Sequence, residues 1–429
     1  MGSSGIAQIP ITRRNLRNLA LMTLTTMWPP NTLVLSRNAI AVRRREPWNN
    51  YVERSGATLE TLADRALAWI CRSQDRVASG GVGDFQFQGW TPGYPEVTGY
   101  IIPTFWDYHR LLGRDELAQR AIRMADWELR VQKPAGGFES LYEGEGRPPV
   151  VFNTGQVIRG LTRTYEETGE GRYLEAAVRA ADWMVANQDP DGSWTRAGYL
   201  GMKRTYDVYA AAGLAKLSTV TANDDHARAA TANCEFALRH QLGNGWFDLC
   251  DNTPGGNATP STHTLCYTID GLIETGEALG EHGFIVGGQR AARALMDRVE
   301  QGGRLPGRFD RYWQPASRSV VLTGSAQLGL ILTRLYRREG ERRLLQTARS
   351  LVDFLAFSQR LNGIGRNRRG GIAGSFPIWG RYVPLKHPSW ATKFFLDHLL
   401  GVRMAFESTS PASAAAAAAD RGDGGVGSS

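Results

Sequence analysis

Apolar residues recur at helical spacing along most of the chain, and the clearest example ends at Gln188. Ala177, Ala181 and Met184 fall on one face of a helix, so this face can pack against a core. The residues that follow, 189–192, are Asp-Pro-Asp-Gly, a combination typical of a tight turn. The pattern predicts an amphipathic helix that ends at Gln188 and is followed directly by a turn.

This pattern of an apolar helix, a final glutamine and a glycine-containing turn recurs through the sequence. Successive copies of the glutamine lie 53 to 60 residues apart. Each glutamine is followed by a glycine and then by an apolar or aromatic residue. Six copies at a nearly constant period predict a repeat architecture. The glutamines are Gln74, Gln132, Gln188, Gln241, Gln301 and Gln359.

Two sets of helices alternate in this repeat. The glutamine-ended helices are expected at 58–74, 115–132, 172–188, 225–241, 287–301 and 341–359. The second set is expected at 97–112, 153–168, 205–219, 262–278, 321–337 and 390–406. The first helix of one set and the last helix of the other have no partner next to them in the sequence, so they can pair with each other. The predicted fold is all-α, a closed (α/α)6 toroid of six helical hairpins over residues 47–408.

Short and long connections alternate between these helices. The short ones contain glycine, and the long ones, of roughly 15 to 30 residues, exceed the usual loop length. In a ring, all long loops emerge at the end where the second set of helices begins. Long loops on a rigid scaffold commonly carry function. The free N–H groups of the six helix N-termini at this end favour an anionic ligand.

The two ends of the chain lack the repeat. Residues 1–46 are expected to form a basic, disordered leader, and residues 409–429 a disordered low-complexity tail. Arg13-Arg14, the apolar 19–22 and Ala39-Ile40-Ala41 together outline a twin-arginine-like export signal within 1–41. Prolines and threonines interrupt its apolar part, which favours the plain leader and a cytoplasmic protein. No apolar run reaches the ~18 residues of a transmembrane helix.

The amino-acid composition limits which kinds of ligand and partner molecule the protein is expected to bind. The formal net charge of +8 permits an anionic partner, but no nucleic-acid recognition motif is present. The four cysteines are too few to staple a chain of 429 residues and are expected to be free thiols. Asp248, Cys250 and His263 are residue types that bind zinc, but their order in the chain does not suit a site. We therefore expect neither a metal ion nor a cofactor.

The long loops differ in charge. Loops 302–320 and 360–389 are rich in arginine, whereas loops 75–96 and 242–261 lean acidic. This asymmetry indicates an anion clamp that faces a general acid or base, with aromatic side chains that stack on sugar rings. The alternative is that most of these residues are solvated or pack the loops. The substrate-binding candidates are Trp90, Tyr94, Gln156, Arg204, Arg308, Arg311, Trp313, Gln327, Trp379, Arg381 and Trp390.

The catalytic candidates stand at the beginnings of the second set of helices, which a toroid brings together around one axis. An acid, a phenol and an imidazole in one partly desolvated pocket suit proton transfer. The structural alternatives are a helix-stabilising role for Glu96 and a core role for His263. The catalytic candidates are Glu96, Tyr100, Tyr206, Asp207, His263, Tyr267 and Lys393.

Several stretches resemble known families. The segment 179–194 resembles the QW-type repeat of squalene cyclases and protein prenyltransferases. The segments 93–100 (GYPEVTGY), 259–267 (TPSTHTLCY) and 371–378 (GIAGSFPI), the last continuing to 388–395 (PSWATKFF), resemble a bacterial family. That family carries prenyltransferase/squalene-oxidase-like repeats, is associated with exopolysaccharide biosynthesis and is also called Vibrio-polysaccharide-J-like. More loosely, 153–160 (NTGQVIRG) is similar to the helical domain of glucuronyl C5-epimerases.

The resemblance covers about residues 57 to 406 and implies an α-toroid in a polysaccharide context. Terpene chemistry is not expected, because the acidic Asp-x-Asp-Asp cluster that class II cyclases use to protonate an alkene is missing. We expect an enzyme that transfers a proton at C5 of a uronate in an acidic oligo- or polysaccharide, for epimerisation or β-elimination. The alternatives are glycoside hydrolysis by Glu96 and Asp207, a non-catalytic glycan-binding component of polysaccharide assembly, and an isoprenoid enzyme.

Overall fold

A computed structural model describes residues 29–44, 48–86, 89–253 and 255–407. The expected export-signal core at 13–22 and the low-complexity tail lie outside these residues. The protein is mostly helical (63%). The four cysteines form no disulfide in the described chain.

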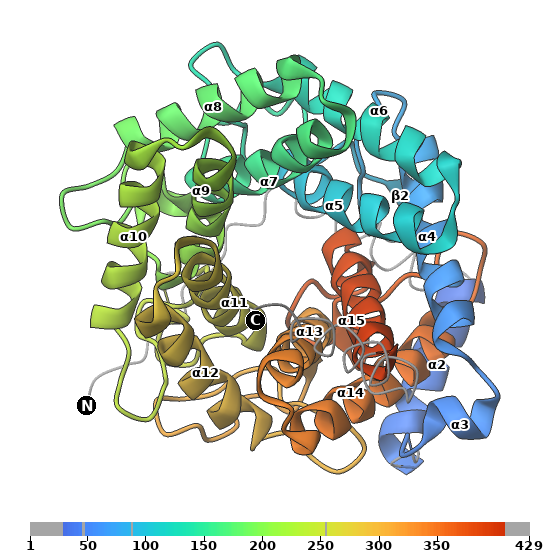
Figure 1. The fold of residues 1–429 in the computed structure, drawn as a ribbon. Coiled ribbons are helices and arrows are strands. Elements are labelled where there is room, and N and C mark those ends of the chain that lie inside the picture. Colours follow the sequence, from blue (N-terminus) through green and yellow to red (C-terminus); the bar gives the residue numbers. More distant parts are fainter. Residues whose placement is uncertain (1–28, 45–47, 87–88, 254, 408–429) are drawn as a thin grey trace, which may run out of the picture.

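Two sets of helices surround a common centre (Figure 1). The inner helices are α5 (Pro95–Leu112), α7 (Val151–Thr168), α9 (Val208–Thr221), α11 (Thr262–Leu279), α13 (Leu322–Glu339) and α15 (Ser389–Glu407). The outer helices are α4 (Leu59–Arg76), α6 (Asp115–Val131), α8 (Gly171–Ala186), α10 (Asp224–Arg239), α12 (His282–Met296) and α14 (Arg342–Asn362). We call the end of the molecule at which the inner helices begin the mouth.

Short strands and helices lie in the segments between the long helices. The two-residue strands β1 (Phe85–Gln86), β2 (Gly89–Trp90) and β5 (Lys386–His387) form an antiparallel sheet in the order β2-β1-β5. β3 (Val320–Val321) pairs with β4 (Ser375–Phe376). The 3₁₀ helices η1 (Tyr199–Gly201) and η2 (Thr205–Asp207) precede α9, and α3 (Tyr51–Ser55) precedes α4. The sheets connect the loops of repeats that are far apart in the sequence.

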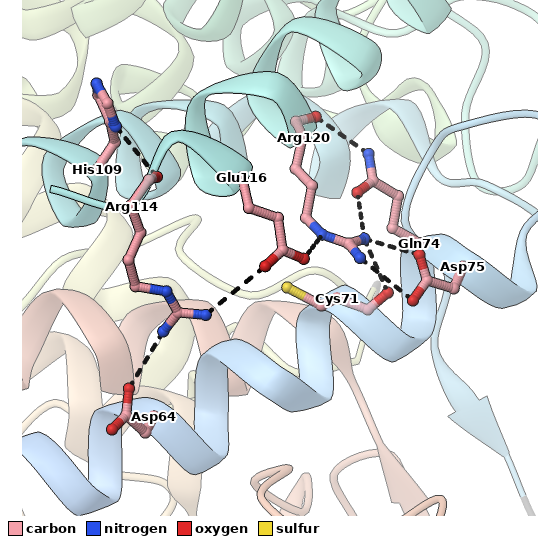
Figure 2. Close-up of polar contacts among 8 residues, drawn as sticks. All are labelled: Asp64, Cys71, Gln74, Asp75, His109, Arg114, Glu116 and Arg120. Carbon is pink, nitrogen blue, oxygen red and sulfur yellow. Dashed lines mark hydrogen bonds and ion pairs between the residues drawn. The ribbon is translucent and has the colours of Figure 1, made fainter. Parts of the chain in front are cut away.

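The helix-ending glutamines join neighbouring repeats. The Nε2 group of Gln132 donates to the carbonyl of Gly136 in its own turn and to that of Ala176 in the next outer helix, at 3.0 and 2.9 Å. Gln74 makes the equivalent pair of bonds to Gly80 and Arg120. Figure 2 shows Gln74 between α4 and α6, where the Arg120 guanidinium also contacts Asp75. The glutamine signal in the sequence is therefore a contact between repeats.

The last repeat contacts the first in the same manner. The Gln359 Nε2 group donates to the carbonyl of Gly370 at 2.8 Å. A Cβ atom at Gly371 would lie 2.6 Å from the Trp69 ring in α4, just as one at Gly137 would lie 2.8 Å from Trp183 in α8. In addition, α15 packs against both α4 and α5 (Figure 1). The beginning and the end of the repeat region thus lie side by side.

One predicted helix is displaced. The prediction placed a glutamine-ended helix at 287–301, but α12 runs from His282 to Met296, and Gln301 makes no side-chain hydrogen bond in the described structure. The prediction assigned residues 280–283 to a link, but only Gly280 ends α11 and Gly283 already belongs to α12. Gly288, within the helix, allows a close approach to α11, since a Cβ there would lie 2.6 Å from Ile273.

Residues 29–44 also differ from expectation. We predicted that they belong to a disordered leader, whereas they form α2 (Pro29–Arg44). Val34, Asn38 and Ala41 form a buried stripe on this helix at helical spacing. The Asn38 Nδ2 group donates to Asn362 Oδ1 at 2.6 Å, which fastens α2 to the end of α14. The described part of the chain contains no helix that combines the length and apolarity needed to cross a bilayer.

Candidate functional site

Titratable side chains from several repeats meet at the mouth. Glu96 lies in the first turn of α5, where Pro95 fixes the backbone at the helix start. The Glu96 carboxylate adds to the effect of burial in raising the pKa of four tyrosines, so all of them lie near it. They are Tyr100, Tyr206, Tyr267 and Tyr382. The mouth therefore brings together predicted residues of the inner helices α5 and α11 and of η2, with Tyr382 from the loop before β5.

Glu96 is poised to exchange a proton near neutral pH. Burial raises the pKa of its carboxyl to about 7, against the lowering effect of the hydrogen bond from Tyr94. The Tyr94 hydroxyl donates to Glu96 Oε2 at 2.6 Å. Asp84, which lies nearby, also raises this pKa. A carboxyl with this pKa can act as a general acid or a general base.

Asp207 is the second acid of the site. Its side chain is only 2% exposed, and burial raises its pKa to about 8 despite the nearby Arg204 guanidinium. Its Oδ2 atom has no hydrogen-bond partner within the described chain. Asp207 is therefore mainly protonated at neutral pH and can donate a proton.

Arg204 is buried beside this acid. Its guanidinium contacts the Lys203 carbonyl at 3.3 Å and the Met202 sulfur at 3.0 Å, and it forms no salt bridge with any described carboxylate. Its Nε group has no hydrogen-bond partner among the described residues. Because Asp207 is largely protonated, the positive charge of Arg204 stays available for an anionic group.

His263 opens the first turn of α11 and is neutral. Its Nδ1 atom lies 2.7 Å from Gln327 Oε1. Since an amide oxygen only accepts, we assign the proton to Nδ1, which leaves Nε2 as an acceptor. Burial lowers the pKa of His263 to about 4, more than the bond to Gln327 raises it. The ring centre lies 4.3 Å from that of Tyr267 and 5.5 Å from that of Tyr382.

Aromatic rings line the space between these groups. Tyr267 packs against Tyr209 and Phe152, with ring centres 4.7 and 4.8 Å apart, and Tyr100 packs against Phe394 at 5.6 Å. The hydroxyls of Tyr100 and Tyr267 have no hydrogen-bond partner in the described structure. Buried phenols without partners are costly, so they are candidates for bonds to a ligand.

A second group of rings forms one wall. Tyr94 makes edge contacts with Trp390 and Tyr142, at 6.2 and 5.5 Å between ring centres. The Trp390 indole N–H donates to the Tyr382 hydroxyl at 2.9 Å, and the Tyr142 hydroxyl donates to Asp84 at 3.1 Å. The sequence analysis gave Tyr142 and Tyr209 no role. Tyr142 lies in a loop and Tyr209 in an apolar helix segment, so only the tertiary contacts reveal them.

Other predicted residues lie elsewhere or have other contacts. Lys393 forms an ion pair with Asp397 at 2.6 Å and lines a cavity of about 560 Å³ near the opposite ends of the inner helices. Arg308 pairs with the buried Asp251 at 3.1 Å. The Trp313 indole donates to the Asn244 carbonyl. Arg308 and Trp313 are thus engaged in contacts within the protein, whereas Lys393 also lies 5.1 Å from the centre of the Tyr100 ring, which lines the same cavity.

The remaining candidates differ in burial. Gln156 is fully buried, and neither of its amide atoms has a partner in the described chain. Trp90 packs against Trp69 at 5.2 Å. Arg311, Trp379 and Arg381 are exposed on loops. No group of three or more His, Cys, Asp or Glu residues in the described ranges is arranged to hold a metal ion.

Comparisons with known proteins reveal a similarity of fold. No family model and no curated protein sequence matches the chain, so the families that it resembles in short motifs gain no support. Among solved structures, an unsaturated glucuronyl hydrolase specific for heparin has a TM-score of 0.66 at 14% identity, over 81% of this chain and 98% of that one.

Two further structures are similar. The cellobiose 2-epimerase of Bacillus thermoamylovorans has a TM-score of 0.63 at 11% identity, over 79% of this chain and 96% of its own. A GH76 alpha-mannanase of Bacteroides thetaiotaomicron has a TM-score of 0.59 at 14% identity, over 84% of this chain and 99% of its own. These similar proteins are α/α-toroid enzymes, and at such low identity the likeness establishes the fold alone.

Proposed function

We propose that this protein is a carbohydrate-active enzyme of bacterial polysaccharide biosynthesis or modification. It acts on an acidic, uronate-containing glycan by proton transfer at C5. The observation that carries the proposal is the combination at the mouth of one neutral imidazole, two carboxyls of raised pKa and one buried guanidinium. These groups are His263, Glu96, Asp207 and Arg204.

Each group has a role in this chemistry. Arg204 binds the uronate carboxylate and stabilises the negative charge that develops on it as the C5–H bond breaks. His263 Nε2 accepts the C5 proton. For epimerisation, protonated Glu96 or Asp207 returns a proton to C5 from the opposite face. For β-elimination, the same acid protonates the leaving oxygen while the C4–O bond breaks and a C4–C5 double bond forms.

The architecture in this proposal is a closed ring of six helical hairpins. It is supported by the contact of the turn after Gln359 with Trp69 and by the packing of α15 on α4 and α5. Such a ring holds the first turns of α5 and α11 around one axis. It explains how Glu96 and His263 reach one site although they are widely separated in the sequence.

Glycoside hydrolysis is the second candidate, because Glu96 and Asp207 are two carboxyls of raised pKa that both act on the pKa of Tyr206. Two of the similar structures are described as a glucuronyl hydrolase and a mannanase. Hydrolysis requires one of the two acids to be ionised when substrate is bound. Arg204 favours ionisation of Asp207, since its charge lowers the pKa of that carboxyl.

The test is to incubate the protein with uronate oligosaccharides in deuterated water and to analyse the products by NMR and mass spectrometry. Epimerisation places deuterium at C5, elimination produces an unsaturated uronate, and hydrolysis produces a new reducing end without deuterium at C5. A new reducing end without deuterium at C5 would contradict proton transfer at C5 and support glycoside hydrolysis instead. Binding without any turnover would favour a non-catalytic glycan-binding component.

A further inference from the structure

A basic notch lies on the outer side of the molecule, between the first and last outer helices. It has a volume of about 420 Å³. One wall comes from α4, another from the end of α14 and the turn that follows, and a third from α2, all on the same side of Figure 1. The lining residues are Arg37, Arg65, Gln359, Arg360, Gly363, Arg369 and Gly370.

We call this cavity the seam notch, because it lies where the last repeat meets the first. Its lining carries only positive charge. Four of its lining residues are arginines and none is acidic. The salt bridges of the described chain include none of the four. Arg72 lies beside them and donates to the Arg369 carbonyl. Burial lowers its pKa, and the neighbouring Arg366 and Arg369 lower it further. Arg72 is thus repelled by neighbouring guanidiniums, and no carboxylate lines the notch to offset this repulsion.

The repeat itself does not require this composition. In the equivalent seam between α4 and α6, the residue after the glutamine is Asp75, whereas here it is Arg360. Asp75 forms a 2.8 Å ion pair with Arg120 (Figure 2). In the seam between α4 and α6, Arg123 is the counterpart of Arg65. The turn glycine Gly80 packs on the Arg123 carbonyl, just as Gly370 packs on the Arg65 carbonyl. The seam between the last and first repeats has the same geometry but lacks the carboxylate.

We propose that the seam notch is a binding site for a ligand with two adjacent phosphate or sulfate groups. Planar guanidiniums match the oxygen spacing of such groups and can bind them in a bidentate manner. The volume lies in the range of small-molecule pockets. The notch lies among outer helices, α2 and the turn after α14, so this site is separate from the Glu96 cluster and does not depend on the proposed reaction.

The probe is inorganic pyrophosphate, titrated into the full chain by calorimetry at fixed ionic strength. The double variant Arg65→Gln/Arg369→Gln is expected to raise Kd at least tenfold. The matched control is Arg123→Gln, which removes one exposed charge from the equivalent helix position and is expected to change Kd less than twofold. Arg65→Lys/Arg369→Lys, which retains charge but loses the planar fork, is expected to give an intermediate Kd.

Further titrations identify the source of the oxyanions. Orthophosphate is expected to bind more weakly than pyrophosphate, and a disulfated disaccharide distinguishes a sulfated glycan from a diphosphate by its relative Kd. Circular dichroism and melting temperature verify that each variant is folded. The proposal fails if pyrophosphate does not saturate a site, if the double variant binds it as well as the native protein does, or if Arg123→Gln weakens binding equally.

Discussion

The two ends of the inner helices treat buried acids in opposite ways. At the mouth, neither Glu96 nor Asp207 forms a salt bridge with a described cation, and burial raises the pKa of both. Toward the other end, Arg334 contacts Asp270 at 2.6 Å and Glu274 at 2.9 Å. Arg159 also contacts Glu274. Both ends are polar, but of these four acids only Asp270 and Glu274 have direct cationic partners.

The difference separates a reactive site from a structural one. Burial acts to raise the pKa of Glu274, but Arg159 and Arg334 outweigh it and lower this pKa to about 2. Glu274 therefore remains charged and holds α7, α11 and α13 together. An acid without such a partner retains its proton near neutral pH and can exchange it with a ligand. Asp270 pairs with Arg334 alone, and burial still raises its pKa to about 7. Two guanidiniums on one acid, as at Glu274, are therefore what offsets burial.

The largest effect is expected from His263→Ala. We expect turnover to fall by about 10³-fold, the typical contribution of a general base. The melting temperature should change little, because within the described residues the His263 side chain makes a single hydrogen bond, to Gln327. Steady-state kinetics and calorimetry on the same preparation measure both. A parallel loss of stability and turnover would instead show that His263 has a structural role. The mouth would then be a structural region, like the opposite end of the inner helices.

Arg334→Met should show the reverse pattern. Removal of the guanidinium leaves Asp270 and part of Glu274 without a partner, which costs about 3 kcal/mol of unfolding free energy. Turnover per folded molecule should not change, because Arg334 does not contact the Glu96 cluster. Denaturant unfolding and active-site-normalised kinetics provide the two values. A large loss of turnover at unchanged stability would show that the opposite end takes part in the reaction.

The scaffold was largely predictable from sequence because each repeat signal has a local cause. Four of the six glutamines bond through their amides to the next outer helix, as Gln132 does with Ala176. Eleven of the twelve predicted helices lie within three residues of the observed bounds. The exception is α12, which begins at His282 because Gly283, predicted as part of a link, lies within the helix; a periodicity of apolar residues cannot distinguish a helical glycine from a turn glycine.

The chemistry was only partly predictable. Glu96 and His263 lie in the first turns of α5 and α11, and Asp207 directly precedes α9, as the repeat pattern indicated; that they form one site stays a prediction. Their pKa values could not be inferred, since these depend on whether a cation from another repeat reaches each acid. The direction of a long side chain is also a tertiary property, which is why Lys393 was grouped with Glu96 but contacts Asp397.

The pH dependence of stability provides a third test. Glu96 and Asp207 have folded pKa values above their unfolded ones, so the native state binds more protons between about pH 4 and 8. Their contribution to stability therefore falls as pH rises through this window, by up to about 1.4 kcal/mol per pH unit for each group. Asp207→Asn should flatten the decline when unfolding free energy is measured across it.

Glu274 supplies the matched control for this measurement. Its folded pKa is depressed, so its contribution is present above about pH 4.5 and is lost as pH falls toward 2. Glu274→Gln should therefore remove the acid limb of the profile, and it should also lessen the decline up to about pH 7, because the Glu274 charge helps to raise the pKa of Asp270. If Asp207→Asn alters the acid limb below about pH 4 as well, the two ends of the inner helices are not electrostatically distinct.

The smallest effect is expected from Lys393→Met, and it tests where the boundary between the two ends lies. The Lys393 ammonium lies 5.1 Å from the centre of the Tyr100 ring and pairs with Asp397. Loss of this pair should cost about 1 kcal/mol, because Asp397 still accepts a hydrogen bond from Thr104 at 2.7 Å. Turnover should change less than about twofold, since general acid–base groups contribute far more than this. A hundredfold loss of turnover in a variant of normal stability would show that Lys393 takes part in the reaction. The reactive site would then extend past Tyr100 toward the opposite end of the inner helices.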